Sequence, residues 1–275
     1  MARRKQDIIL ENVTIEAVAA EGKALARIDG TVLFVQFAVP GDIVDVKVTK
    51  KKKNYMEGFI LRMVKPSEHR LEPFCKHFGI CGGCKWQPLP YEMQLQAKQQ
   101  QVYDQLVRIG HLDVPEISPI VPSDETTYYR NKLEFTFSQR RWIFDDENAE
   151  VLTDQEKYGL GFHVGRFFDK VLDIEHCYLQ PSPSNEIRLF VRKYALEHDL
   201  TFFNIREHVG FLRNSIEQGS AGLNIFMVET DDKHHIAFLS CSDEHVAEES
   251  YMLADIEECK SVLKSIVSDE EADLV

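Results

Sequence analysis

No apolar run in this sequence is long enough to cross a lipid bilayer. A membrane-spanning helix needs about 20 consecutive apolar residues, whereas the longest apolar stretches here, such as residues 31–40, are far shorter. The basic residues 1–7 are not followed by the apolar segment of a secretory signal peptide. Internal repeats and low-complexity segments are also missing. These absences lead us to expect a cytoplasmic protein that makes no use of a membrane.

Cysteine is scarce as well, and structural disulfides are not expected in a chain without an export signal. The sequence has six cysteines among 275 residues, and intracellular proteins rarely keep such thiols oxidised. Three of the six, Cys75, Cys81 and Cys84, stand close together. Such clustering is typical of a metal site.

Positive charge is in short supply over the whole chain but not at its beginning. The formal net charge of −13 by itself argues against a nucleic-acid partner. Residues 1–70, however, carry 13 Lys and Arg against 9 Asp and Glu, whereas residues 243–275 carry 2 against 11. The N-terminal part can therefore face phosphate groups locally, and we expect the acidic C-terminal segment to be a solvated helix face.

Hydrophobic patterning predicts an α+β chain. Short β-branched segments separated by turn signals predict a small β-barrel over residues 6–65, which ends at Lys65-Pro66-Ser67. An apolar face at helical spacing predicts a helix over residues 91–109 and consists of Leu95, Val102, Leu106 and Ile109. Further expected elements are strands at 128–138, 158–164, 171–174 and 235–240, a helix at 185–198 capped by Ser184 or Asn185, a hairpin turning at 219–222, and a helix at about 244–266.

The strongest chemical signal is Cys75-x5-Cys81-Gly-Gly-Cys84. Thiolates at this spacing can converge on one centre only if the backbone folds tightly, and the two glycines permit that. Three thiolates do not complete a four-ligand site, and Cys177 is the best fourth candidate because it follows a strand and precedes a proline-rich turn. The other two, Cys241 and Cys259, fit worse and read as core or surface thiols. Four thiolates suit zinc or an iron–sulfur cluster, and spacing alone leaves both open.

The residues around these cysteines resemble a known family. The run from Cys75 to Cys84, followed by Gln87, Tyr91, Gln94 and Lys98, looks like the cluster motif of the bacterial 23S ribosomal RNA uracil-5 methyltransferases. The resemblance extends to both sides. Gly22-Lys23-Ala24, Val35 and Pro40-Gly41-Asp42 look like a TRAM domain, and Tyr129-Arg130-Asn131-Lys132, Leu160-Gly161-Phe162-His163 and Asp173-Ile174-x2-Cys177-x-Leu179-Gln180 resemble the family's central domain.

This resemblance implies a fold and a cofactor. We expect an OB-like TRAM β-barrel over residues 6–65, an α+β iron–sulfur central domain over residues 66–243, and an acidic helix and tail over residues 244–275. In the family, the four matching cysteines hold a [4Fe-4S] cluster, which assigns it here to Cys75, Cys81, Cys84 and Cys177. The helix at 91–109 packs on the catalytic domain in the family, so its apolar face should be exposed here.

The resemblance also implies what this chain lacks. The family places S-adenosylmethionine and a nucleophilic cysteine in a C-terminal Rossmann-like domain, where the cysteine adds to uracil C6 and a base removes the C5 proton. Neither the glycine-rich cofactor loop nor the Asp-Pro-Pro-Arg segment of that domain occurs in the sequence. We therefore expect the N-terminal portion of such an enzyme, with no catalytic residue of its own.

Two segments are candidates for RNA contacts. Lys50, Lys51, Lys52 and Lys53, with Tyr55, lie between two expected strands, where four ammonium groups and a ring suit phosphates and a base. Arg130, Asn131 and Lys132 combine a guanidinium, an amide and an ammonium group at the start of a strand. Both segments have a plainer interpretation as solvated surface. The expected partner is RNA, by resemblance 23S rRNA, bound by a monomer.

Two other functions share some of these sequence features. The chain could be a stand-alone, non-catalytic RNA-binding iron–sulfur protein. A radical methylthiotransferase also combines a TRAM domain with a cluster, but it uses Cys-x3-Cys-x2-Cys and carries the TRAM domain at the other end, and neither feature occurs here.

Overall fold

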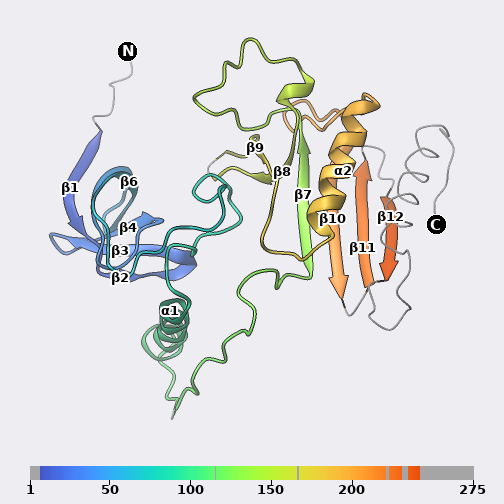
Figure 1. The fold of residues 1–275 in the computed structure, drawn as a ribbon. Coiled ribbons are helices and arrows are strands. Elements are labelled where there is room, and N and C mark those ends of the chain that lie inside the picture. Colours follow the sequence, from blue (N-terminus) through green and yellow to red (C-terminus); the bar gives the residue numbers. More distant parts are fainter. Residues whose placement is uncertain (1–6, 115, 166, 221–222, 231–234, 242–275) are drawn as a thin grey trace. The chain divides into compact units, whose positions relative to one another are not determined.

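The computed structural model describes residues 7–114, 116–165, 167–220, 223–230 and 235–241 (Figure 1). It contains two compact units, residues 1–79 with 84–126, and residues 80–83 with 127–275. The first unit thus extends beyond the domain boundary predicted at residue 66 and includes the helix at 91–109. No helix among the described residues is long and apolar enough to cross a membrane. The predicted helix at 244–266 lies outside the described residues.

The first unit is built on one six-stranded sheet. Its strands are β1 (Ile8–Thr14), β2 (Ala17–Val18), β3 (Lys23–Ile28), β4 (Thr31–Gln36), β5 (Ile43–Lys51) and β6 (Tyr55–Lys65), and a short helical turn, η1 (Ala20–Gly22), precedes β3. The order across the sheet is β1–β5–β6–β4–β3–β2, with β4 and β6 parallel and the other neighbours antiparallel. The predicted strands are confirmed.

The expectation of a closed barrel is not confirmed. The edges of the sheet are β1 and β2, and no strand pairing joins them in the described residues. A physical reason is the length of β2, since two residues offer too few backbone groups for a second ladder. Between β1 and β2 the backbone bonds to the β4–β5 turn: Ile15 N–H donates to Asp42 O at 2.9 Å, and Gly41 N–H donates to Ile15 O at 2.8 Å.

The core of this unit follows from the alternation of side chains along its strands. Every second residue of β3, β4 and β5 points to one face, and the buried residues on that face include Ala24, Leu33, Val35, Val44 and Val46. Ala24 and Ala26 on β3 lie opposite Val35 and Leu33 on β4, so small and larger residues are paired in this core.

A buried carboxylate holds the turn between β4 and β5. Asp42 has no exposed surface and accepts N–H groups from Val39 at 2.7 Å and Ser67 at 2.9 Å. The guanidinium of Arg70 contacts the same carboxylate at 2.8 Å. A side chain at Gly41, whose φ is +91°, would lie 2.8 Å from Ser67 Oγ, so only glycine fits. The turn ties the segment that follows β6 back to the sheet.

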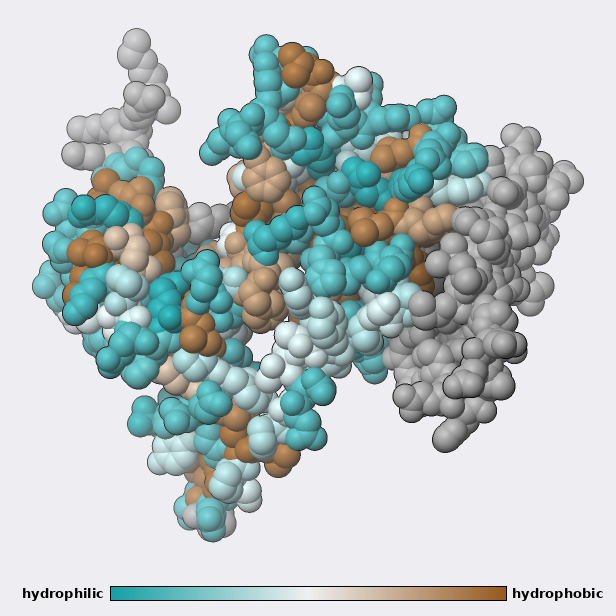
Figure 2. Space-filling model, viewed as in Figure 1, coloured by the Kyte–Doolittle hydropathy of each residue, from teal (hydrophilic) through white to brown (hydrophobic). Residues whose placement is uncertain are grey.

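The predicted helix over residues 91–109 is present but changes character along its length. It is α-helical as α1 (Tyr91–Tyr103) and continues as a π-helical segment, η2 (Asp104–Ile109). Within the described chain none of its residues is buried, and Val102 and Ile109 are 44% and 74% exposed. Figure 2 shows hydrophobic surface among hydrophilic residues in the lowest part of the view, where this helix lies. Two of the four residues of the expected apolar face are thus exposed, whereas Leu95 and Leu106 are half-buried; packing of the helix on a further domain stays a prediction.

The second unit is a six-stranded antiparallel sheet covered by one helix. Its elements are β7 (Lys132–Ser138), η3 (Gln155–Lys157), β8 (Gly159–His163), β9 (Val171–Asp173), α2 (Ser184–Glu197), β10 (Leu212–Ser220), β11 (Leu223–Thr230) and β12 (His235–Cys241). The order is β12–β11–β10–β7–β8–β9, and α2 lies across one face of the sheet (Figure 1). Val191 and Ala195 of α2 pack in one core with Phe135, Phe137 and Leu160.

The start of α2 differs from the prediction. Its N-cap is Pro183, and no side chain caps the helix. Ser184 and Asn185, the predicted caps, are the first helical residues, and their side chains bond elsewhere: Ser184 Oγ donates to Glu217 and Asn185 bonds to Cys177. Tertiary partners therefore outcompete the local cap.

We expect Asp42→Ala to destabilise the first unit by about 3 kcal/mol, because it leaves two buried N–H groups and the guanidinium of Arg70 without their acceptor. Urea unfolding followed by circular dichroism measures the loss. Glu16→Ala is the control, since its 2.6 Å ion pair with Arg27 is solvent-exposed and should contribute less than about 1 kcal/mol. Equal losses from the two variants would contradict the role assigned to Asp42.

Candidate cysteine site and RNA-facing surfaces

The four cysteines of the predicted ligand set form no disulfide in the part of the chain that the structure describes. Cys75 and Cys84 belong to the first unit, and Cys81 and Cys177 to the second. Within the described residues, no group of three or more His, Cys, Asp or Glu side chains is arranged to hold a metal ion. Neither unit alone could supply such a group from these cysteines, because each contains only two of the four.

Cys81 is attached to the sheet of the second unit by backbone contacts. It forms an isolated antiparallel bridge with Val164, at the end of β8, and Gly82 N–H donates to His163 O at 3.1 Å. A side chain at Gly82 would lie 2.7 Å from that carbonyl oxygen, so a glycine is required for this approach. Gly83 N–H in turn lies 3.4 Å from the sulfur of Cys81. The Gly-Gly pair therefore both positions the loop and provides a donor to sulfur.

Cys75 is positioned by glutamines of the same motif. The side-chain oxygen of Gln87 accepts the Cys75 N–H at 3.3 Å. Gln94 on α1 donates to Trp86 O at 3.2 Å and to Leu89 O at 2.8 Å. Gly22, whose φ is +71°, leaves room for the indole, because a side chain there would lie 2.6 Å from Trp86 Nε1. The glutamines of the motif thus fold the chain on the C-terminal side of the cysteines.

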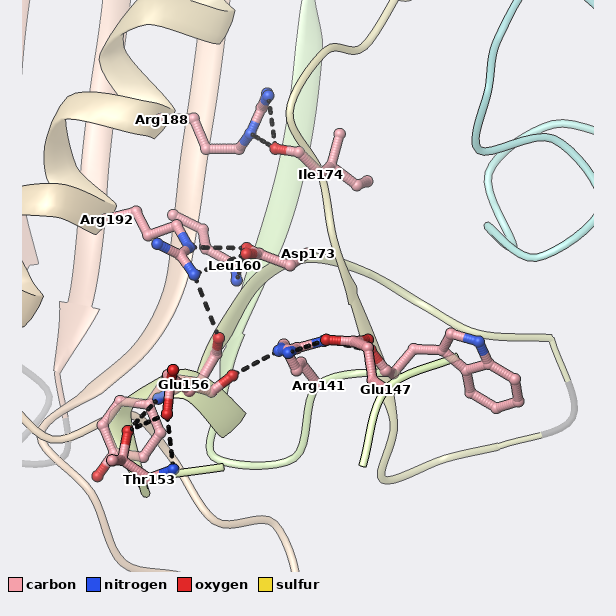
Figure 3. Close-up of polar contacts among 11 residues, drawn as sticks. Arg141, Glu147, Thr153, Glu156, Leu160, Asp173, Ile174, Arg188 and Arg192 are labelled. Carbon is pink, nitrogen blue, oxygen red and sulfur yellow. Dashed lines mark hydrogen bonds and ion pairs between the residues drawn. The ribbon is translucent and has the colours of Figure 1, made fainter. Parts of the chain in front are cut away.

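Cys177 is held by a two-sided amide contact with α2. Asn185 Oδ1 accepts the Cys177 N–H at 2.7 Å, and Asn185 Nδ2 donates to Cys177 O at 3.0 Å. Arg188, one turn along the helix, donates to Asn185 Oδ1 at 3.0 Å and to Ile174 O at 3.0 Å. The bond from Arg188 to Ile174 is drawn in Figure 3. These contacts, which we call the α2 clamp, fix the backbone from Ile174 to Cys177.

The clamp is deeply buried. Arg188 has no exposed surface, and its guanidinium lies 4.7 Å from the centre of the Phe135 ring. Glu217 on β10 is also buried and accepts a hydrogen bond from Ser184 Oγ. Burial raises the pKa of Glu217 to about 7, against the opposing effects of the Ser184 bond and the charge of Arg188. The first turn of α2 is therefore anchored on one side to the sheet and on the other to Cys177.

A second set of ion pairs fixes β9 and the long loop before β8 (Figure 3). Asp173 pairs with Arg192 of α2 at 2.7 Å and accepts the Leu160 N–H at 3.0 Å. In the loop, Arg141 contacts both carboxylate oxygens of Glu147. Hydrogen bonds from Arg141, and from Phe144 N–H, lower the pKa of Glu147 to about 2. These contacts hold the strand that leads into the Ile174–Cys177 segment.

The lysine run forms the tip of the β5–β6 hairpin. Lys50, Lys51, Lys52 and Lys53 are all exposed. Lys50 is engaged within the protein: its Nζ lies 3.1 Å from Glu57 Oε1 and 5.3 Å from the centre of the Tyr55 ring. Hydrogen bonds to Tyr55 and Glu57 raise the pKa of Lys50. The structure thus places Lys50 beside Tyr55 and presents all four lysines on the surface.

The second predicted RNA segment is exposed at the start of β7. Arg130, Asn131 and Lys132 are all accessible. Arg130 N–H donates to Leu179 O at 2.8 Å, and its guanidinium lies 6.0 Å from the centre of the Tyr129 ring. The backbone is fixed while the side chains face solvent, which suits contact with a ligand.

Comparison with known proteins places these features in context. Residues 11–61 match the TRAM domain family. Over 204 residues the chain is 53% identical to an uncharacterized RNA methyltransferase of Porphyromonas gingivalis, covering 72% of this chain and 44% of that protein. It is 50% identical over 204 residues to an uncharacterized RNA methyltransferase of Bacteroides thetaiotaomicron, covering 74% of this chain and 45% of that protein. The chain therefore spans less than half the length of these curated relatives.

A solved structure shares the fold. The crystal structure of the Pyrococcus abyssi tRNA (uracil-54, C5)-methyltransferase in complex with S-adenosyl-L-homocysteine matches with a TM-score of 0.50 and 23% identity, over 80% of this chain and 45% of that one. At this identity the match shows a shared fold and nothing further. The TRAM domain and the resemblance to RNA methyltransferases expected from the sequence are thus confirmed.

Sequence reasoning missed the α2 clamp. The sequence pattern predicts Asn185 only as a helix cap and assigns no role to Arg188. The available signal was the spacing Asn-x2-Arg on the side of a helix that also carries Val191 and Tyr194, because an arginine on an apolar helix face needs buried acceptors.

We expect Asn185→Ala to expose the thiol of Cys177 in the metal-free chain. Cys177 is 8% exposed, and loss of both amide contacts frees the loop that shields it. Reaction with a thiol reagent, located by peptide mass mapping, should become at least about tenfold faster at Cys177, which corresponds to about 1.4 kcal/mol in the opening equilibrium. Gln155→Ala, which removes side-chain contacts to Leu196 and Asp199 at the other end of α2, is the control. An unchanged rate at Cys177 in Asn185→Ala would show that the clamp does not hold the loop.

Proposed function

We propose that this chain is the N-terminal portion of an S-adenosylmethionine-dependent RNA uracil-5 methyltransferase, in which it supplies RNA binding and an iron–sulfur cluster. The observation that carries the proposal is its identity of 53% and 50% to proteins named RNA methyltransferases, over almost three quarters of its length. The uracil-5 specificity is supported by the cysteine motif in the sequence and is in keeping with a shared fold. Methyl transfer is assigned to the remainder of such a protein.

RNA binding is proposed for the exposed cations of both units. Four lysines at one hairpin tip can neutralise several phosphates, and each neutralised phosphate releases counterions, which favours binding at low salt. Arg130 adds a guanidinium fork, which suits bidentate contact with a phosphate or a base edge. The proposed RNA is 23S rRNA, and the proposed binding form is a monomer.

A [4Fe-4S] cluster is proposed for Cys75, Cys81, Cys84 and Cys177. The chemistry of the donors supports it: four thiols outside any disulfide, one of them with a backbone N–H directed at its sulfur, are the ligand type that such clusters use. When bound, the cluster supplies a covalent link between its four cysteine segments. The chain's own residues orient the ligands: Gly82 and Gly83 shape the loop at Cys81, Gln87 holds Cys75, and Asn185 holds Cys177.

RNA binding by the 275-residue chain is the first test. Affinity for a 23S rRNA fragment should fall with salt, and replacing Lys50–Lys53 with Ala should weaken binding and reduce the salt slope by about 0.7 for each lost phosphate contact on single-stranded RNA. The slope comes from fluorescence anisotropy at several salt concentrations.

The chain alone should transfer no methyl group from labelled S-adenosylmethionine, whereas a longer protein that includes the remaining domain should.

Charge-matched variants distinguish a specific contact from a change in net charge. Lys52→Ala with Lys53→Ala removes the same charge as Lys157→Ala with Lys193→Ala, whose lysines lie in the second unit near Asp154 and Glu197. Only the first pair should reduce the slope. Equal effects would remove the hairpin from the proposed interface. Turnover by residues 1–275 alone would overturn the assignment of catalysis to another domain, and tighter binding to tRNA would overturn the choice of 23S rRNA.

Metal content tests the cluster. Protein purified anaerobically should be brown and contain about four irons per chain. Cys177→Ser should lower both the iron content and the thermal stability, whereas Cys259→Ser, outside the proposed ligand set, should leave the iron content unchanged. Stoichiometric zinc without iron would contradict the cluster assignment.

A further inference from the structure

Two adjacent phenylalanines lie on the surface of the second unit, in the turn between β8 and β9. Phe167 is 46% and Phe168 is 65% exposed. The turn is itself well anchored: Val164 N–H donates to Lys170 O at 2.9 Å, and Phe167 N–H to Val164 O at 3.1 Å. Single exposed apolar residues are common on protein surfaces. Two neighbouring rings held on a short, hydrogen-bonded turn call for a more specific explanation.

Neighbouring segments hold these rings in place. Trp142 N–H donates to Val171 O at 2.7 Å, which places the tryptophan segment beside β9. The Trp142 ring, partly buried against the core of the unit, lies 5.4 Å from the Phe167 ring between centroids. The guanidinium of Arg206 lies 5.6 Å from the centre of the Phe168 ring. Each phenylalanine thus contacts one fixed side chain and keeps a large part of its ring in solvent.

Cations gather at Asp169, the residue that follows the two phenylalanines. Asp169 is 5% exposed, and its carboxylate holds Arg140 at 2.8 Å and Arg206 at 2.7 Å. Lys170 follows in the chain, and partial burial together with the nearby Arg140 lowers its pKa, as expected among like charges. One buried carboxylate therefore positions two guanidinium groups beside a third cation. Because these side chains are already ordered, little conformational entropy would be lost on binding an anion.

We propose that Phe167, Phe168 and their flanking cations Arg140, Lys170 and Arg206, which we call the β8–β9 platform, bind single-stranded RNA by stacking bases on the rings while the cations contact the backbone. Single-stranded nucleic acids bind proteins at aromatic faces next to positive charge, because every base can stack on a ring and every phosphate linkage carries a negative charge. This inference rests on the proposed function and adds a second interface, in the second unit, to the lysine hairpin of the first.

The chain contains a matched control for this surface. Phe144, in the loop before β8, is 41% exposed, similar to Phe167. Its neighbours are acidic, however: Asp145, Asp146 and Glu147 follow it directly, and its N–H donates to Glu147 at 2.9 Å. A ring among carboxylates should be avoided by RNA, so Phe144 tests exposure without the cations.

The experiment compares Phe168→Ala, Phe168→Leu and Phe144→Ala in the 275-residue chain, with a fluorescein-labelled oligouridylate as the probe. Both Phe168 variants should weaken binding by about tenfold, because leucine keeps the apolar bulk but not the stacking face. The salt slope should stay unchanged, which separates the loss of stacking from the loss of phosphate contacts caused by the lysine variants. Phe144→Ala should bind like the unmodified chain. Ultraviolet cross-linking with peptide mapping should place the RNA on the segment containing Phe167 and Phe168.

The outcomes separate this inference from the proposed function. If the unmodified chain binds no RNA, the proposed function fails and the platform with it. If the chain binds RNA but both Phe168 variants match Phe144→Ala, the platform is wrong while RNA binding stands, and the surface belongs to a different kind of partner, such as a protein. If Phe168→Leu binds normally and only Phe168→Ala is weak, the ring does not act by stacking and the proposal is overturned. Circular dichroism of each variant confirms that the fold is intact.

Discussion

The second unit depends on a guanidinium that is buried without a close carboxylate to pair with it among the described contacts. Removing a charge from water costs several kcal/mol unless hydrogen bonds replace the lost hydration. Arg188 obtains part of this replacement from the carbonyls of Ile174 and Glu175 and from the amide of Asn185, while its Nη1 is buried without a hydrogen-bond partner among the described residues. These acceptors stay in place only when the chain from β9 to Cys177 follows one path over the helix. The cost of burying Arg188 therefore becomes a constraint on the position of Cys177.

Glycine provides the corresponding constraint on the other cysteine segment. Gly82 approaches β8 so closely that a Cβ atom there would lie 2.7 Å from the His163 carbonyl oxygen. A Cβ atom at Gly22 would lie 2.6 Å from Trp86 Nε1, so this glycine leaves space for the indole. Both glycines allow close packing, one against a backbone carbonyl and the other against an aromatic ring, and neither supplies a reactive group. The residues that make the cysteine motif recognisable in the sequence thus fall into two groups: the thiols, and the glycines and glutamines that fold the chain around them.

The strands and helices could be predicted because their signals are local. The β-branched runs of β4 and β5 and the helical spacing from Leu95 to Ile109 can be recognised without any knowledge of distant contacts. The open edge of the first sheet was not predictable, since it depends on β2 being only two residues long in a segment without a strong pattern. The start of α2 was mispredicted for a related reason. Ser184 and Asn185 have good capping side chains, but partners far away in the sequence, Glu217 and Cys177, take them.

The same reasoning explains how an acidic chain can be proposed to bind RNA. At physiological salt the Debye length is about 8 Å, so a phosphate responds to the nearest side chains and hardly to a net charge of −13 summed over the whole chain. What matters is how exposed the cations are and how much of their charge nearby carboxylates offset. Lys51, Lys52 and Lys53 are exposed at a hairpin tip, while the acidic residues of the second unit, such as Glu147 and Asp173, are engaged by arginines within the fold. Such ion pairs are locally neutral and leave the net charge unchanged, so the exposed lysines at the hairpin tip are the groups that we propose an RNA backbone meets.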